Sequence, residues 1–282
     1  MSLTVNNLLQ EMATYFSDSA ISPPHMKLQM PTKNNKKLEQ VIGRVNGDVE
    51  LATLWKASNV MAIDRMGFND HGPTHVKIIA HIALKMLRIL MVRGRVPSIV
   101  KDHKMEPEDA EVVVVLGSLM HDIGHVVHRE NHEEFGITLA VPVIDRLLHG
   151  IYDREAATVV RGEVLHCIIS HTSGIAPQTL EAGIVKVADA LDMEKGRARI
   201  PFHTGSVNIH SVSAMAIDKV EIMSGKTKAL DIEITMNNSA GIFQIDNLLR
   251  ERLEESRLRS YISVAVMISG AEKKIIQKRI EI

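Results

Sequence analysis

The segment LMHDIGHVVHRENHEEFG, residues 119–136, gathers side chains of the types that bind metal ions. It holds four of the chain's 14 histidines, with an aspartate directly after the first: His121, Asp122, His125, His128 and His132. Three more such residues lie in apolar surroundings, namely His75 in HVKII, His171 in LHCIISH and Asp189 in IVKVADAL. A buried imidazole or carboxylate without a partner is costly, so convergence on one shared cation would satisfy them together.

The mixture of imidazole and carboxylate indicates which ion would bind. Such ligands suit Mn, Fe, Co, Ni or Zn, whereas a site made of carboxylates alone would suit Mg or Ca. Adjacent helical residues point about 100° apart, so His121 and Asp122 can reach one ion only near a helix end. Gly124 predicts such an end within HDIGH.

Each of these residues also has a plainer interpretation when it is taken singly. His75 could be a hydrogen-bonded core histidine, and His121–Asp122 could be a helix cap with an ion pair. Asp189 could be a buried carboxylate paired with Lys186 or Arg197. The ordered combination of all of them favours the metal site.

Helices are expected to carry this set. Pro73 predicts a helix start before THVKIIAHIALKMLRILMV, and Pro107 predicts another that leads into VVVVLGSLMHD. The valine run could also be a buried strand, but no turn signal interrupts it, so helix is preferred. Further helices are predicted over residues 134–148, 153–171 and 178–195.

The composition is that of a globular protein, with 45% hydrophobic and 24% charged residues. Aromatic residues make up only 3%, which favours helices, and the net charge of -1 gives no strong nucleic-acid signal. The single cysteine, Cys167, excludes an internal disulfide and fits a reducing compartment. No apolar run is long enough to span a membrane and the start lacks a signal-peptide pattern, so we expect a cytoplasmic protein.

After about residue 205 the pattern of apolar and polar residues changes from helical spacing to strand-like alternation. DKVEIMSGKTKALDIEITM predicts a hairpin, IFQIDNLLRERLEESRL an amphipathic helix, and YISVAVMIS and KKIIQKRIEI two more strands. This β-β-α-β-β module shows no evident chemistry, and RLEESRLRS is interpreted as a solvated helix face. Its outer strands could pair across subunits, which makes a homo-oligomer possible. The predicted divisions are an N-terminal helical and linker segment (1–45), a helical domain (46–204) and the α+β module (205–282).

The order His75, His121–Asp122, Asp189 resembles the H…HD…D signature of the HD-domain metal-dependent phosphohydrolases. NHEEFG, IISHTSG and LEAGIVKVADALDMEKGR are similar to the additional motifs of the two-metal members, with bacterial diadenosine-tetraphosphate hydrolases nearest. The resemblance covers about residues 70–200. It implies a mainly α-helical HD domain to which the α+β module is appended.

The resemblance also implies roles for individual residues. His75, His121, Asp122 and Asp189 would hold one divalent transition metal, and Asp122 would bridge to a second held by His132 and His171. A water activated by the metals would attack phosphorus. The candidate phosphate or substrate contacts are His71, His125, His128, Lys186 and Arg197. His71 could equally bind an extra metal or cap its helix.

Two departures narrow the function. Many two-metal members have lysine three residues after the HD aspartate, whereas this chain has His125, as in the HDIGH of related deoxynucleoside triphosphate hydrolases. The paired histidines and GYP triplet of cyclic-dinucleotide phosphodiesterases are missing, which disfavours those substrates. The sequence therefore predicts a phosphohydrolase of a nucleotide or other small phosphate ester, with Asp122, His125 and Arg197 as catalytic residues. The alternative is a regulatory protein that binds a ligand at the same site without turning it over.

Overall fold

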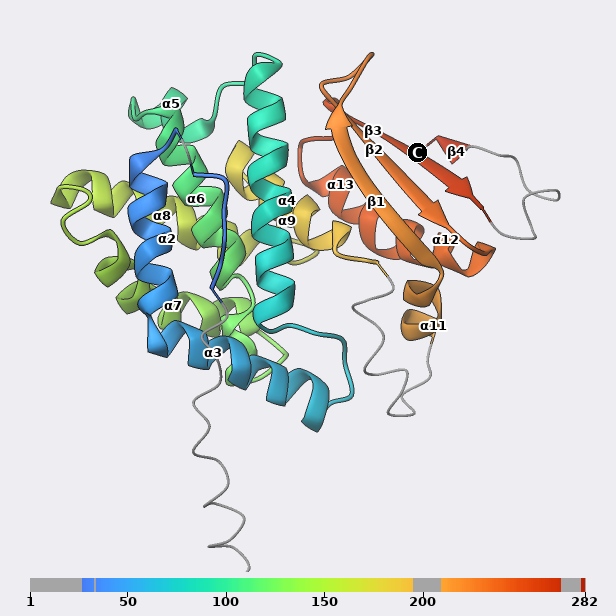
Figure 1. Ribbon diagram of the computed structural model, residues 1–282, viewed down its shortest axis with the longest axis horizontal. Coiled ribbons are helices and arrows are strands. Elements are labelled where there is room, and N and C mark those ends of the chain that lie inside the picture. Colours follow the sequence, from blue (N-terminus) through green and yellow to red (C-terminus); the bar gives the residue numbers. More distant parts are fainter. Residues whose placement is uncertain (1–26, 33, 195–208, 270–279, 282) are drawn as a thin grey trace, which may run out of the picture.

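The computed structural model describes residues 27–32, 34–194, 209–269 and 280–281. Helices dominate the first part and a small sheet the second (Figure 1). The predicted first helix and Arg197 lie outside the described residues. The elements of the helical part are α2 (Lys36–Gly47), α3 (Val49–Asn59), η1 (Val60–Arg65), α4 (Pro73–Val92), α5 (Ser98–His103), α6 (Pro107–Met120), η2 (Ile123–Val126), α7 (His132–Leu148), α8 (Arg154–Ser170) and α9 (Leu180–Leu191).

Helix α6 is the centre of the helical part, and it contacts α4, α8 and α9. Every residue from Asp109 to Met120 is buried. A helix that is apolar on all sides is stable only inside a core, which explains why its valine run could also suggest a strand. Its start is fixed as predicted by Pro107, together with a capping box between Glu106 and Asp109.

From β1 to β3 the C-terminal part has the predicted order of elements, whereas α11 was not predicted and most of the fourth predicted strand lies outside the described residues. Helix α11 (Ile209–Met215) precedes the sheet, and η3 (Ser239–Gly241), α12 (Ile242–Gln244), η4 (Ile245–Arg250) and α13 (Glu251–Glu255) form the connection across it. The strands are β1 (Ile217–Ser224), β2 (Leu230–Met236), β3 (Ile262–Ile268) and β4 (Ile280–Glu281), in the order β1-β2-β3-β4. β1 and β2 form the expected antiparallel hairpin, β2 and β3 are parallel, and β3 and β4 are antiparallel.

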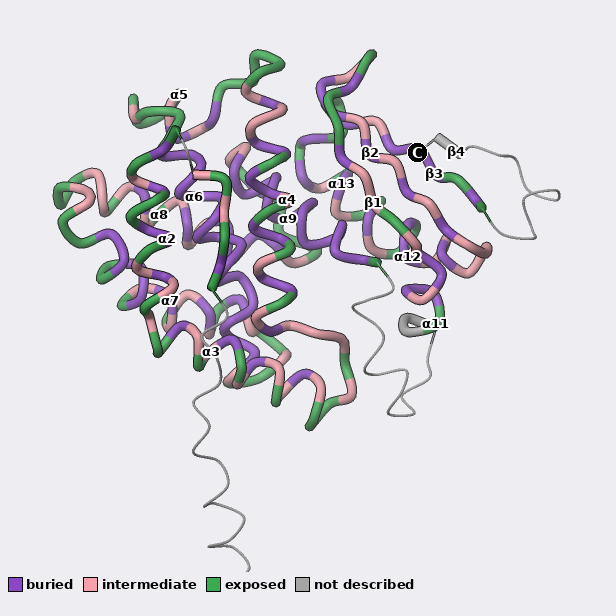
Figure 2. The backbone as a smooth tube through the Cα atoms, in the orientation of Figure 1, coloured by how far each residue is buried: buried purple, intermediate pink, exposed green. Residues whose placement is uncertain are grey.

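The two parts share one apolar core. Buried residues occur in both the helical part and the sheet (Figure 2). Strand β2 buries alternate residues, and buried apolar side chains of both parts belong to a single cluster that also includes residues of α2. Contacts between α9 and α13, and between α4 and β1, join them. A Cβ on Gly183 of α9 would lie 2.5 Å from the backbone oxygen of Ser256, so only glycine permits this close approach. The connecting helices therefore pack against α9, the helix that carries Asp189, and the sheet packs against α4.

Candidate metal centre

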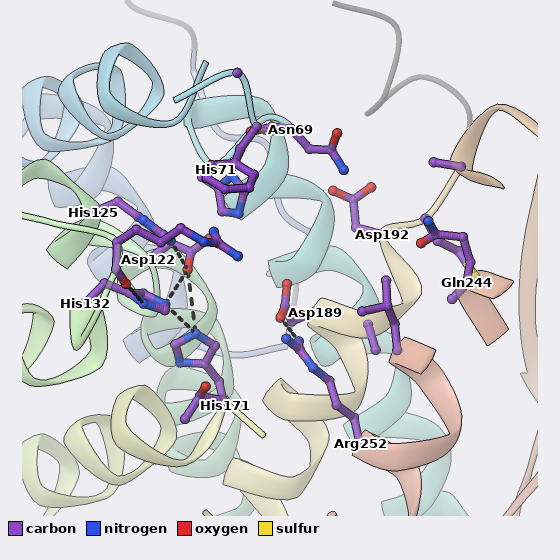
Figure 3. A pocket seen from close by; sticks show the side chains of 18 residues that line it. Asn69, His71, Asp122, His125, His132, His171, Asp189, Asp192, Gln244 and Arg252 are labelled. Atoms are coloured by element: carbon purple, nitrogen blue, oxygen red, sulfur yellow. Dashed lines mark hydrogen bonds and ion pairs between the residues drawn. The ribbon is translucent and has the colours of Figure 1, made fainter. Parts of the chain in front are cut away.

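The predicted histidine ligands come together around Asp122, at the point where α6 ends. Figure 3 shows two of them, His132 and His171, beside Asp122. His121 is the C-cap of α6, and the chain then turns into the 3-10 helix η2, as the HDIGH sequence predicted. A Cβ on Gly124 would overlap the backbone oxygen of His132. The small size of Gly124 is therefore what lets α7 begin against η2 and place His132 beside Asp122.

The two carboxylate oxygens of Asp122 face different groups of histidines. Oδ2 lies 3.3 Å from His75 Nε2 and 3.2 Å from His121 Nε2. Oδ1 lies 3.3 Å from His132 Nε2 and 3.6 Å from His171 Nε2. Asp122 thus stands between two clusters that we call the first group (His75, His121, Asp122, Asp189) and the second group (Asp122, His132, His171).

Asp189 completes the first group. Its Oδ1 is 3.3 Å from His75 Nε2 and 3.8 Å from His121 Nε2. Its other oxygen, Oδ2, accepts from Nη1 of Arg252, which belongs to α13. Among the described residues, the arginine or lysine paired with Asp189 is therefore Arg252, and the alternative pairing with Lys186 is not formed because Lys186 contacts Glu255.

The hydrogen bonds at the outer nitrogens assign the tautomers of four rings. Nδ1 of His121, His132 and His171 donates to the backbone oxygens of Ser118, Arg129 and Ile168 at 2.8, 2.8 and 2.7 Å. Nδ1 of His75 donates to Oδ2 of Asp192 at 2.6 Å. In a neutral ring of this tautomer Nε2 presents a lone pair to the centre, which is the arrangement that metal-binding histidines require. Burial opposes protonation of His132, but Asp122 outweighs it and raises the pKa of this ring.

This arrangement places acceptors against acceptors. His132 Nε2 and His171 Nε2 are 3.2 Å apart, and both approach Asp122 Oδ1. His121 Nε2 is buried and has no hydrogen-bond partner among the described residues. Lone pairs converging in a site shielded from water repel each other unless a proton or a metal cation lies between them, and a metal cation can satisfy several of them at once. The donor set therefore fits a metal in each group, and its mixture of imidazole and carboxylate fits a divalent transition metal.

Electrostatics keep both carboxylates ionised. Burial opposes the charge on Asp122, but His121, His125 and His132 outweigh it and hold the pKa of Asp122 well below its usual range. Burial likewise opposes the charge on Asp189, and Arg252 is foremost among the groups that hold its pKa low. Burial lowers the pKa of His171, which favours the neutral ring that a metal needs.

His125 and His71 border the second group. His125 Nε2 is 3.4 Å from Asp122 Oδ1, and its ring stacks on that of His132 with centroids 4.0 Å apart. Its Nδ1 is buried and has no hydrogen-bond partner in the part of the chain that the structure describes. His71, whose ring meets that of His125 edge-on, could join His125 and Asp122 in a third set of ligands.

A cavity of about 270 Å³ opens over these residues. The walls are made by both parts of the chain, and they include Phe68, Asn69, His71, His125, Arg129, Gln244, Leu248 and Arg252. Ligand pockets commonly measure about 300–1,000 Å³, so this cavity suits a small ligand.

Two predicted substrate contacts are placed elsewhere. Lys186 lies away from the cavity wall: its buried amine contacts Glu255 at 2.6 Å and donates to the backbone oxygens of Thr172 and Ile175. His128 is exposed and lines a neighbouring surface hollow, where its Nδ1 accepts from the Glu130 amide.

The sequence showed no evident chemistry in the C-terminal module, but two of its side chains, Gln244 and Arg252, line the cavity. The interpretation of RLEESRLRS as a solvated face is wrong, since Leu253 and Ser256 are buried. A weak signal was present in the sequence. The apolar residues Leu249 and Leu253 flank Arg252 and mark this face of the helix as inward.

Comparisons with known proteins agree with the geometry. The HD domain family model matches residues 71–194, which span His71 to Asp192 of the site. The chain is 45% identical over 226 residues to the uncharacterized protein MJ1020 of Methanocaldococcus jannaschii, and the match covers 80% of this chain and 87% of that protein. No solved structure matched the chain. The ligand set and these two likenesses show that the chain belongs to the HD domain family of metal-dependent hydrolases.

Proposed function

We propose that this protein is a phosphohydrolase with a two-metal centre that cleaves a nucleotide or another small phosphate ester. One observation carries the proposal. The two oxygens of Asp122 face two separate sets of histidine Nε2 atoms, which supports a role for Asp122 as a ligand shared by two ions.

The protein residues would then have distinct tasks. His75, His121 and Asp189 would hold one ion, His132 and His171 the other, and Asp122 both. When bound, such ions lower the pKa of a water and neutralise the charge of a phosphate, which is the chemistry that phosphate hydrolysis needs. A chain with a net charge of -1 has no general excess of cations to do this.

The surrounding side chains would bind and orient the substrate. His125 lines the cavity with its Nε2 3.4 Å from Asp122 Oδ1, so its ring is placed to contact a phosphate held beside Asp122. Arg129 lies over the ring of Phe68 at 4.2 Å from its centroid, on the cavity wall. An arginine beside an aromatic ring at the mouth suits a ligand with both a phosphate and a planar group, which supports a nucleotide.

The experiment is a metal analysis coupled to a substrate panel. The protein is loaded with Mn, Ni or Co and assayed against phosphomonoesters, phosphodiesters and nucleoside polyphosphates, with the released product identified. Asp122→Ala should lose both bound metal and turnover while it keeps the helical circular dichroism spectrum. Turnover that persists in Asp122→Ala contradicts the proposal. Bound metal without hydrolysis of any substrate class would favour a regulatory protein instead.

A further inference from the structure

Helix α13 of the C-terminal module contacts the HD domain beside the cavity through an ion pair, a hydrogen bond and close backbone packing. Glu255 contacts the buried amine of Lys186 at 2.6 Å, and its Oε1 accepts from the Gly174 amide at 3.0 Å. Gly183 permits the backbone of Ser256 to lie against α9. The orientation of α13 is thus fixed by contacts other than those of Arg252, so Arg252 is held at the cavity by the fold around it.

The guanidinium of Arg252 is positioned beside the first group of ligands. Its Nη1 donates to Oδ2 of Asp189 (Figure 3). The other oxygen of that carboxylate, Oδ1, lies near His75 and His121. The side chain is 20% exposed and lines the cavity together with Gln244 and Leu248 from the same stretch of chain. Within the described residues, the pairing with Asp189 engages only Nη1 of the five-donor fork.

The charges of the cavity indicate what those remaining donors would bind. Three aspartates, Asp122, Asp189 and Asp192, and two arginines, Arg129 and Arg252, line the cavity. One guanidinium nitrogen of such an arginine is hydrogen-bonded to a carboxylate that can bind a metal. Its remaining N–H groups are then available to donate to two oxygens of a phosphate held at that metal.

We propose that Arg252 is the residue through which the C-terminal module binds the substrate's phosphate, so that the active site is completed by both parts of the chain. This inference rests on the proposed function. Arg252 would contact a phosphate oxygen directly, and its bond to Asp189 would hold the guanidinium in place before the substrate arrives.

The test measures the binding of inorganic phosphate by isothermal titration calorimetry to the full-length, Mn-loaded protein. Arg252→Lys keeps the positive charge but removes the fork, so phosphate affinity should fall about tenfold or more while bound Mn stays unchanged. Arg250→Lys is the matched control. Arg250 lies two residues away, is half exposed and pairs with Asp246 at 2.9 Å, so its replacement should leave phosphate affinity at the wild-type value.

Two results would overturn the inference. Phosphate affinity in Arg252→Lys equal to that of Arg250→Lys would show that Arg252 does not touch phosphate. Loss of Mn from Arg252→Lys would show that it acts only through Asp189. Hydrolysis of phosphate esters by the wild-type protein is measured separately. If the wild type hydrolyses them and either of these results is found, the proposed function stands and only the role of Arg252 is rejected.

Discussion

At the scale of single residues, the ligand rings are oriented by their own helix ends. His121, His132 and His171 each bond the carbonyl of the residue three positions earlier. Such a local contact forms together with the helix end itself and needs no metal. The Nε2 lone pairs are therefore aimed at the centre before any ion binds, which reduces the cost of ordering them on binding.

The two-metal assignment predicts a selective loss at His171. His171→Ala removes one nitrogen from the second group and none from the first, so the metal content measured by elemental analysis should fall from two ions to one per chain. His166→Ala is the control, because His166 lies on the same helix and accepts from the Gln178 amide instead. Unchanged stoichiometry in His171→Ala would rule out a second ion at this place.

At the scale of elements, the sequence predicted the helix ends and the hairpin correctly where the determining residues lie within the element itself. Pro73 and Pro107 predicted two helix starts, HDIGH predicted the end of α6, and the alternation around GKT predicted the hairpin. Arg252 could not be foreseen in the same way. Its partner Asp189 lies 63 residues earlier, and their meeting depends on how α13 packs on α9.

The close contact between η2 and α7 at Gly124 should determine where α7 begins and so where His132 lies. Gly124→Ala would force a methyl group into the backbone of His132, and overpacking of this kind costs about 1–3 kcal/mol. The shift should move His132 away from Asp122, so both the free energy of unfolding and the affinity for the second ion should fall, while the first ion remains bound.

Gly162→Ala provides the comparison for Gly124→Ala. Gly162 lies within α8, and among the described residues no neighbouring atom comes within 4 Å of the place that an alanine methyl group would take. Alanine should therefore stabilise this helix by up to about 1 kcal/mol. Urea unfolding and metal titration are measured on both variants. Equal metal affinity in the two would mean that the close approach at Gly124 does not set the position of His132.

At the scale of the whole molecule, the helical part and the module are joined by one apolar core and by the cavity between them. None of the helices among the described residues is long and apolar enough to cross a membrane. A shared core implies that neither part keeps its stability when the other unfolds. Because both parts line the cavity, we expect a metal bound in the HD domain to stabilise both parts against unfolding.

Calorimetry tests this coupling directly. The full-length protein should unfold in a single thermal transition, and added Mn should raise its midpoint because the ions bind only the folded state. A chelator should lower the midpoint of the same transition without splitting it. If instead two transitions appear and Mn shifts only one of them, then the module folds independently of the HD domain. Arg252 would in that case belong to a separately folding unit and would not be a fixed part of the cavity wall.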